Sequence, residues 1–176
     1  SITSVPRKSA SLSKDRYISN EFMELEWEGI WTKTWLFAGI ESDLAEVGDF
    51  FVYDIGRESI VITRNEEMKI SAFYNVCQHR GNKIVTIESG SFNKVSCPYH
   101  GWTYSLNGKL EHVPDRELFE GGVPCEKHSL KPVRVSIWAG LIFVNMDEKS
   151  SSLETFLGPI IDQLKPYKFE KMSLVK

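Results

Sequence analysis

Two short segments, each with one cysteine and one histidine, constrain this chain more than any other feature of its sequence. They are CQHRG at 77–81 and CPYHGWTY at 97–104. Four candidate metal ligands lie in them, namely Cys77, His79, Cys97 and His100. Gly81 and Gly101 come after the histidines, and glycines allow unusual backbone angles and a close approach to a ligand. Two tight loops that each present a thiolate and an imidazole can therefore enclose a metal centre from two sides.

The mixed ligand set leaves two kinds of metal centre open. One is a tetrahedral structural zinc site. The other is a 2Fe–2S cluster of Rieske type, in which two histidines hold one iron and two cysteines hold the other. Zinc loops usually pair two cysteines or two histidines, so a Cys-x-His loop opposite a Cys-x-x-His loop fits zinc poorly. In the iron–sulfur case the formal charges of two ferric ions, two sulfides and two thiolates cancel, and a neutral centre accepts an electron more readily than a negative one.

The sequence resembles Rieske iron–sulfur proteins, and more closely the N-terminal domain of the α subunit of aromatic ring-hydroxylating, Rieske-type oxygenases. Beyond the two loops, VPDRELF at 113–119 and VSIWAGLIFVNMD at 135–147 resemble the closing strands of such domains, and the resemblance covers residues from about 17 to 176. It implies that the cluster ligands are Cys77, His79, Cys97 and His100. It also implies six supporting neighbours: Arg80, Gly81, Tyr99, Gly101, Trp102 and Tyr104.

Three positions separate this chain from the respiratory Rieske proteins. Asn82 and Tyr99 stand where those proteins carry two further cysteines that form a disulfide, and Trp102 replaces a serine whose hydroxyl bonds a cluster sulfide. The resemblance is therefore to the low-potential branch, which contains oxygenases and their ferredoxins. The alternative is a stand-alone Rieske-type ferredoxin, an electron carrier that is usually shorter. A helix expected at 20–35 and a tail at 150–176 favour the oxygenase.

The resemblance implies an oxidoreductase that inserts oxygen into an aromatic or other small organic substrate. Its electrons would come from NAD(P)H through a reductase or ferredoxin and would pass between neighbouring α subunits, often in a trimer. Such an enzyme also needs a mononuclear iron(II) site with two histidines and a carboxylate. Only His112 and His128 remain, and both are expected to be surface or turn residues. We therefore expect a fragment that lacks this iron site, which the family carries in a larger C-terminal domain, and that does not turn over alone.

The pattern outside the loops predicts a mainly β fold, a Rieske-type antiparallel β-sandwich with a small cluster-binding subdomain. The expected divisions are an extended arm at 1–18, a leading helix at 19–36, the Rieske domain at 37–149 and the start of a linker at 150–176. An apolar stripe recurs every three to four residues along the helix, which predicts that this face packs on the rest of the chain: Met23, Trp27, Ile30, Trp31 and Trp35. Ser151 and Glu154 predict a capping box for a short second helix that ends near Gly158.

Strands are expected wherever short apolar or alternating runs lie between turn residues. The candidates are 35–40, 49–55, 59–64, 68–74, 92–96, 102–106, 109–113, 131–137 and 140–146. RNEE at 64–67 and NG at 107–108 predict hairpin turns.

Composition narrows the classes of protein that remain. The chain of 176 residues has a net charge of −3, which argues against a general nucleic-acid binder. It lacks an apolar run near the roughly 18 residues of a membrane span, and its N-terminal residues lack the apolar core of a signal peptide. Its three cysteines are too few for a secreted disulfide scaffold, which predicts a cytoplasmic protein in which Cys125 is a free thiol.

Overall fold

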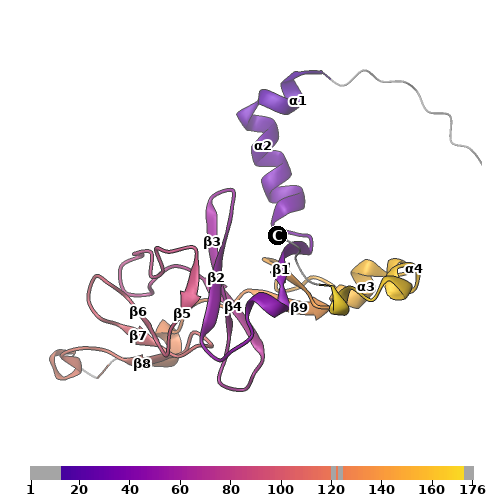
Figure 1. The fold of residues 1–176 in the computed structure, drawn as a ribbon. Coiled ribbons are helices and arrows are strands. Elements are labelled where there is room, and N and C mark those ends of the chain that lie inside the picture. The colour runs from indigo at the N-terminus through magenta and orange to yellow at the C-terminus, as the bar shows by residue number, and fades with distance from the viewer. Residues whose placement is uncertain (1–12, 120–121, 123–124, 173–176) are drawn as a thin grey trace, which may run out of the picture.

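The computed structural model describes residues 13–119, 122 and 125–172. It has three antiparallel sheets, with a helical segment at each end of the described chain. In Figure 1 the four-stranded sheet lies in the middle, the smallest strands lie on one side of it, and the helices lie on the other. The mainly β, antiparallel fold predicted from the sequence is confirmed.

The first sheet joins the two ends of the domain. Its order is β1 (Leu36–Ile40), β10 (Leu141–Asn145) and β9 (Arg134–Trp138). The second sheet has the order β4 (Ile70–Tyr74), β3 (Glu58–Arg64), β2 (Asp49–Ile55) and β5 (Ser89–Ser91). The third has the order β6 (Val95–Ser96), β7 (Thr103–Tyr104) and β8 (Leu110–His112). Three 3₁₀ turns connect these strands: η2 (Glu41–Asp43), η3 (Arg116–Leu118) and η4 (Cys125–His128).

Strand β3 is the centre of the core, because its residues are buried on both faces. Ile60 and Ile62 pack with strands of the first sheet, such as Ile142 on β10. Val61, between them, belongs to a second apolar cluster with Phe73, and this cluster also contains the two loop cysteines. The core therefore continues from the central sheet directly beneath the candidate ligand loops.

Both hairpin turns expected from the sequence are present. The β3–β4 turn is closed by Asn65, whose backbone N–H donates to the carbonyl oxygen of Lys69 at 2.8 Å. The β7–β8 turn contains Gly108 with a φ of +83°, where a side chain would press within 3.1 Å of the Phe73 ring. Gly108 is thus required both by the turn and by the close approach of the two sheets.

The leading helix is shorter than the predicted range of 19–36. It consists of α2 (Asn20–Glu26) and a π-helical turn η1 (Trp27–Trp31), and Ser19 caps it by accepting a hydrogen bond from the Phe22 N–H at 3.2 Å. Its last turn is π-helical, since the N–H of Thr32 donates to the carbonyl of Trp27, five residues back, and the helix ends at Trp31. The chain then extends, and the indole N–H of Trp35 donates to the Ser151 carbonyl at 3.0 Å.

Residues 15–18 are helical, so the prediction of an extended arm over 1–18 is wrong for them. They form a single helical turn, α1 (Asp15–Ile18), which begins where the Ser13 hydroxyl oxygen accepts a hydrogen bond from the Asp15 N–H at 3.3 Å. The remainder of the predicted arm, residues 1–12, lies outside the described residues.

The C-terminal segment has the predicted helix but not the predicted cap. Helix α3 (Leu153–Leu157) is capped by Ser152, whose hydroxyl accepts from the Thr155 N–H at 3.2 Å, rather than by Ser151. The Ser151 carbonyl instead accepts a hydrogen bond from the Trp35 indole. The helix ends at Gly158, as predicted, and short helical turns follow: α4 (Ile160–Leu164), η5 (Lys165–Tyr167) and η6 (Phe169–Lys171).

None of the helices that the structure describes is long and apolar enough to cross a bilayer.

Candidate metal centre

The first candidate ligand loop is a closed six-residue turn at 77–82. The N–H of Cys77 donates to the carbonyl of Asn82 at 2.9 Å, and the N–H of Gly81 donates back to the carbonyl of Cys77 at 2.9 Å. Gly81 has a φ of +73°, a conformation that other residues adopt only with strain. The turn buries Cys77 and leaves Gln78 and Arg80 exposed, so it presents its cysteine inward.

The second loop, at 97–102, has the same hydrogen-bond pattern. The N–H of Cys97 donates to the carbonyl of Trp102 at 2.8 Å, and the N–H of Gly101 donates to the carbonyl of Cys97 at 3.0 Å. Gly101 has a φ of +70°. The two turns thus have the same backbone hydrogen bonds at equivalent positions. They differ in that the histidine is the third residue of the first loop and the fourth of the second.

The two histidines point their ring nitrogens at each other. The Nδ1 atoms of His79 and His100 are 3.1 Å apart, and the rings meet nearly at right angles, with an interplanar angle of 71°. Trp102 lies parallel to the His79 ring at a centroid distance of 4.7 Å, and Tyr99 lies over the His100 ring at 3.8 Å. Each imidazole is therefore held by an aromatic side chain from the second loop.

The imidazole of His79 is favoured in its neutral form. Burial lowers its pKa, and electrostatic repulsion between a charged His79 and the nearby His100, Arg80 and His128 side chains lowers it further. Neutral imidazole is the form that binds a metal, because the lone pair on Nδ1 must be free.

The two cysteines form a second pair, in which the Cys77 and Cys97 thiols are hydrogen-bond neighbours. Cys77 is 2% exposed and Cys97 is 3% exposed, and neither forms a disulfide. Burial raises the pKa of the Cys77 thiol, a hydrogen bond with Tyr104 partly offsets this, and the neighbouring Cys97 thiol adds to the rise. A pair of buried thiols is costly to ionise without a cation beside it, so these two sulfurs suit metal ligation.

Tyr104 provides the hydrogen bond to the sulfur. Its hydroxyl oxygen lies 3.3 Å from the Cys77 sulfur and accepts from the Gln78 N–H at 3.3 Å. Burial, and then the hydrogen bond with Cys77, raise the pKa of Tyr104 above its ordinary value. The phenol therefore keeps its proton and is a donor toward a Cys77 thiolate.

The arrangement fits a two-iron cluster better than a single metal ion. In the described part of the chain, no three His, Cys, Asp or Glu side chains gather around one point that could hold a single ion. The donors instead form one imidazole pair and one thiol pair. This division is what a cluster with histidines on one iron and cysteines on the other requires, and a tetrahedral zinc site does not.

The sequence predictions for the other residues near the site have mixed outcomes. Gly81, Gly101, Tyr99, Trp102 and Tyr104 all contact or shape the two loops, as described above. His112 is exposed on β8 and His128 lies in the η4 turn, both as expected. His128 is half-buried and also lies edge-on to Trp102 with a centroid distance of 5.7 Å, a contact that was not predicted. Because Trp102 and His128 are 26 residues apart in the sequence, no local pattern predicts this contact.

The side chain of Cys125 lies outside the described residues, so the free thiol stays a prediction. Asn75, by contrast, is a buried residue of the site that the sequence did not single out. Its side chain bonds residues 84 and 85, beyond the first loop.

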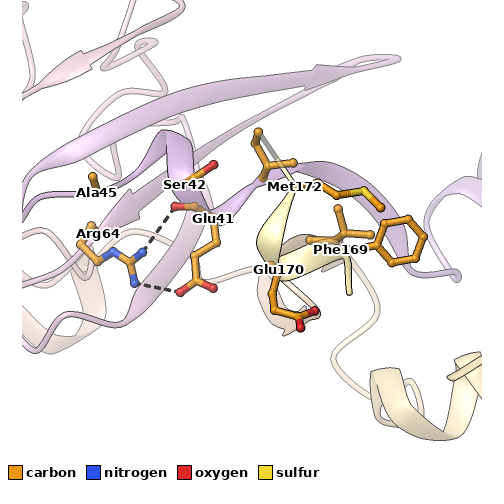
Figure 2. A pocket seen from close by; sticks show the side chains of 10 residues that line it. Glu41, Ser42, Ala45, Arg64, Phe169, Glu170 and Met172 are labelled. Carbon is orange, nitrogen blue, oxygen red and sulfur yellow. Dashed lines mark hydrogen bonds and ion pairs between the residues drawn. The ribbon is translucent and has the colours of Figure 1, made fainter. Parts of the chain in front are cut away.

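A separate hollow of about 480 Å³ lies between Arg64 and the C-terminal turn (Figure 2). Figure 2 shows the Arg64 guanidinium turned toward Glu41, with Phe169 across the hollow. Arg64 donates to the Leu44 carbonyl at 2.7 Å and to the Glu41 carboxylate at 3.2 Å. The arginine thus fastens the η2 turn to β3, and the hollow contains none of the four candidate ligands.

An antiparallel β domain that joins two thiols and two imidazoles from matched loops defines a class of metal-binding electron-transfer domain. The model of the family described as the Rieske [2Fe-2S] domain matches residues 34–130, more than half of the chain. The chain belongs to this family, and its cofactor is the Rieske 2Fe–2S cluster.

The relatives are oxygenase subunits. The glycine betaine monooxygenase oxygenase subunit of Pseudomonas aeruginosa (strain UCBPP-PA14) is 32% identical over 171 residues, which are 94% of this chain and 38% of that protein. The biphenyl dioxygenase subunit alpha of Paraburkholderia xenovorans (strain LB400) is 37% identical over 149 residues, 81% of this chain and 32% of that protein.

Among solved structures, the quaternary ammonium Rieske monooxygenase CntA with gamma-butyrobetaine matches with a TM-score of 0.87 and 32% identity. The match covers 94% of this chain and 48% of that one. The chain thus spans less than half the length of the proteins to which it is similar.

Proposed function

We propose that Cys77, His79, Cys97 and His100 ligate the cluster, and that the chain is the electron-accepting domain of an oxygenase α subunit. The observation that carries the proposal is the approach of the two Nδ1 atoms to 3.1 Å, opposite a pair of buried thiols. A bound Rieske cluster supplies one-electron storage and release. The division of the chain follows: an N-terminal segment that ends with α1, the leading helix formed by α2 and η1, the Rieske domain at 37–149 and a linker that starts within 150–176.

The residues around the cluster prepare it for electron transfer. The aromatic rings of Trp102 and Tyr99 fix the orientation of the two imidazoles. Tyr104 donates a hydrogen bond toward the Cys77 sulfur, which stabilises added negative charge there. Tyr99 is 60% exposed and covers His100, so the loop tips are the face through which an electron enters or leaves.

The whole protein would use these electrons to activate oxygen at a mononuclear iron(II) in a further, C-terminal domain. The substrate class in the proposal is a small organic molecule. The named substrates of the relatives divide between quaternary ammonium compounds and an aromatic hydrocarbon, so both aromatic ring hydroxylation and quaternary ammonium oxidation fit. That the matches include the leading helix and the C-terminal segment favours this over a stand-alone ferredoxin.

The partners in the proposal are a ferredoxin or reductase that takes electrons from NAD(P)H, and neighbouring α subunits, as in a trimer. One quaternary ammonium Rieske monooxygenase is described with inter-subunit electron transfer, which supports this arrangement. The buried thiols of Cys77 and Cys97 must remain reduced until the cluster is assembled, which favours a cytoplasmic location.

Reductive titration of the loaded chain tests the proposal. The visible absorbance should fall as the loaded chain takes up one electron, and it should return in full when an oxidant removes that electron. A loaded chain whose colour does not respond to dithionite would contradict an electron-transfer role.

A further inference from the structure

The two ligand loops are closed alike but supported differently at their bases. The second loop stands on the β6–β7 ladder, where Val95 pairs with Tyr104 and Ser96 with Thr103. The first loop follows β4, which ends at Tyr74. In the described structure no β-ladder joins residues 75–76 to residues 83–85 on the other side of this loop.

One side chain stands in the place of the missing ladder. Asn75 is 1% exposed and comes two residues before Cys77. Its Oδ1 accepts hydrogen bonds from the Ile84 N–H at 3.1 Å and the Val85 N–H at 2.9 Å. Its Nδ2 donates to the Val85 carbonyl at 2.8 Å and to the Ser59 hydroxyl at 3.2 Å. The amide thus uses its full hydrogen-bonding capacity, and it ties the start of the loop to its end.

We propose that Asn75 is a positioning residue for the cluster, and that it holds the first loop in register with the second. Its hydrogen bonds replace the ladder rungs that support the second loop, and its bond to Ser59 anchors the base to β3. This keeps Cys77 and His79 opposite Cys97 and His100. The inference rests on the proposed function, because the loop matters only if it holds the cluster.

The physical reason is the burial of the backbone groups involved. Ile84 and Val85 are buried, and among the described residues only the Asn75 side chain bonds their N–H groups and the Val85 carbonyl. Buried groups without a partner draw in water or force the chain to move. Either change loosens the loop at its base, although no ligand has been altered.

Asn65 provides a matched control. It is also buried, and its Oδ1 accepts from the Glu67 and Lys69 N–H groups, each at 3.0 Å, while its Nδ2 donates to the Ser71 hydroxyl at 2.9 Å. Its side chain ties the backbone of the β3–β4 turn together, as the Asn75 side chain ties the base of the first loop. It lies at the opposite end of the same hairpin, because Arg64 pairs with Ile70 there and Ile60 pairs with Tyr74 at the Asn75 end.

The test compares cluster loss in the full chain, measured as the decay of visible absorbance under excess iron chelator. Changes to residues that support metal ligands typically weaken binding by about 10–100-fold, so Asn75→Ala should lose the cluster about tenfold faster than wild type or more. Asn65→Ala should stay within about twofold of wild type, although both variants lower the melting temperature. Equal rates for the two alanine variants would overturn the positioning role.

Two further measurements complete the design. Asn75→Asp keeps the oxygen that faces the Ile84 and Val85 N–H groups but loses the donor, so its rate should fall between wild type and Asn75→Ala. Should Asn75→Ala not fold, Asn75→Asp takes its place against Asn65→Ala, and equal rates again overturn the inference. In the cluster-loaded chain, hydrogen exchange at Ile84 and Val85 should speed up in Asn75→Ala and not in Asn65→Ala. A wild-type chain that takes up no cluster contradicts the proposed function itself, whereas a loaded wild type with equal rates contradicts only the role of Asn75.

Discussion

Tyr104 is the residue through which the fold acts most directly on a ligand sulfur. Its protonated hydroxyl lies 3.3 Å from the sulfur of Cys77. Trp102, in place of a hydroxyl-bearing residue, packs flat on His79 and offers no such bond to a sulfide. We therefore expect a midpoint potential at the low end of the Rieske range, which runs from about −150 to +300 mV.

The change Tyr104→Phe should lower this potential further. The lost hydrogen bond no longer stabilises the negative charge of the reduced cluster, a loss of about 1.5–3 kcal/mol for a charged acceptor. For one electron, about 1.4 kcal/mol corresponds to 59 mV, so the shift should be on the order of 100 mV. Protein-film voltammetry measures it, with Tyr53→Phe in the other core cluster as the control. An unchanged potential in Tyr104→Phe would show that the hydroxyl does not act on the sulfur.

The ligand assignment is tested by three serine variants. Cys77→Ser and Cys97→Ser should each lose the cluster and destabilise both loops, because metal binding and folding are coupled at such sites. Cys125→Ser should keep the visible spectrum of wild type. Absorbance spectra after purification decide the matter, and a bleached Cys125→Ser beside a coloured Cys97→Ser would reverse the assignment.

The sequence was informative about the candidate ligands and their close neighbours, and silent about the support that comes from Asn75 and His128. Cys77 and His79 stand close together in a recognisable loop, so their pairing was predictable. Asn75 bonds Val85, ten residues ahead, and Ser59, 16 residues back. A buried asparagine of this kind leaves no periodic pattern in a sequence. The contact of His128 with Trp102 was missed for the same reason.

Among the secondary-structure elements, the leading helix differs most from its prediction. Its apolar stripe predicts one packed face, yet Met23 is 56% exposed and Ile30 is 51% exposed, while Trp27 and Trp35 are buried. Figure 1 shows the reason: the helix stands away from the sheets and meets them only near its C-terminal end. Periodicity reports that a face is apolar, and it cannot report which part of that face the same chain covers.

The small strand β5 was missed for a related reason. It reads SGS and its residues are exposed, so it has no apolar alternation. It exists because its backbone pairs with the edge of β2, where Phe50 lies opposite Gly90. Pairing of this kind depends on a neighbour in space and not on local sequence.

The contact between the helix and the central sheet gives a prediction for Gly56→Ala. Gly56 has a φ of +55°, and a Cβ there would lie 2.2 Å from the Trp27 ring. The variant should unfold more easily, by about 1–3 kcal/mol, because the helix must move away. Thermal unfolding measures this, and the visible spectrum should not change, because the contact lies outside the ligand loops.

Gly29→Ala is the matched control on the same helix. A Cβ at Gly29 meets nothing within 4 Å, so this change should be neutral or slightly stabilising. If Gly56→Ala were as stable as Gly29→Ala, the packing of Trp27 on the β2–β3 turn would not hold the helix in place.

For the whole molecule, the fold class was predictable because alternating apolar residues and turn residues marked strands such as 49–55 and 59–64 closely. The arrangement of three sheets was not predictable from these patterns, because order and pairing depend on contacts between distant segments, such as β1 with β10. The resulting architecture places the loops and the helices on opposite sides of the central sheet (Figure 1). The ligand loops and the helical segments are therefore separate surfaces of the molecule.

Whether the two loops together hold one two-iron cluster is tested most directly by the metal and sulfide content of the purified chain. Iron and acid-labile sulfide should be present in equal amounts, two of each per chain. The protein should be red-brown, and after reduction it should show a paramagnetic signal whose average g value lies below that of the free electron. A colourless protein with one stoichiometric zinc per chain would contradict the account.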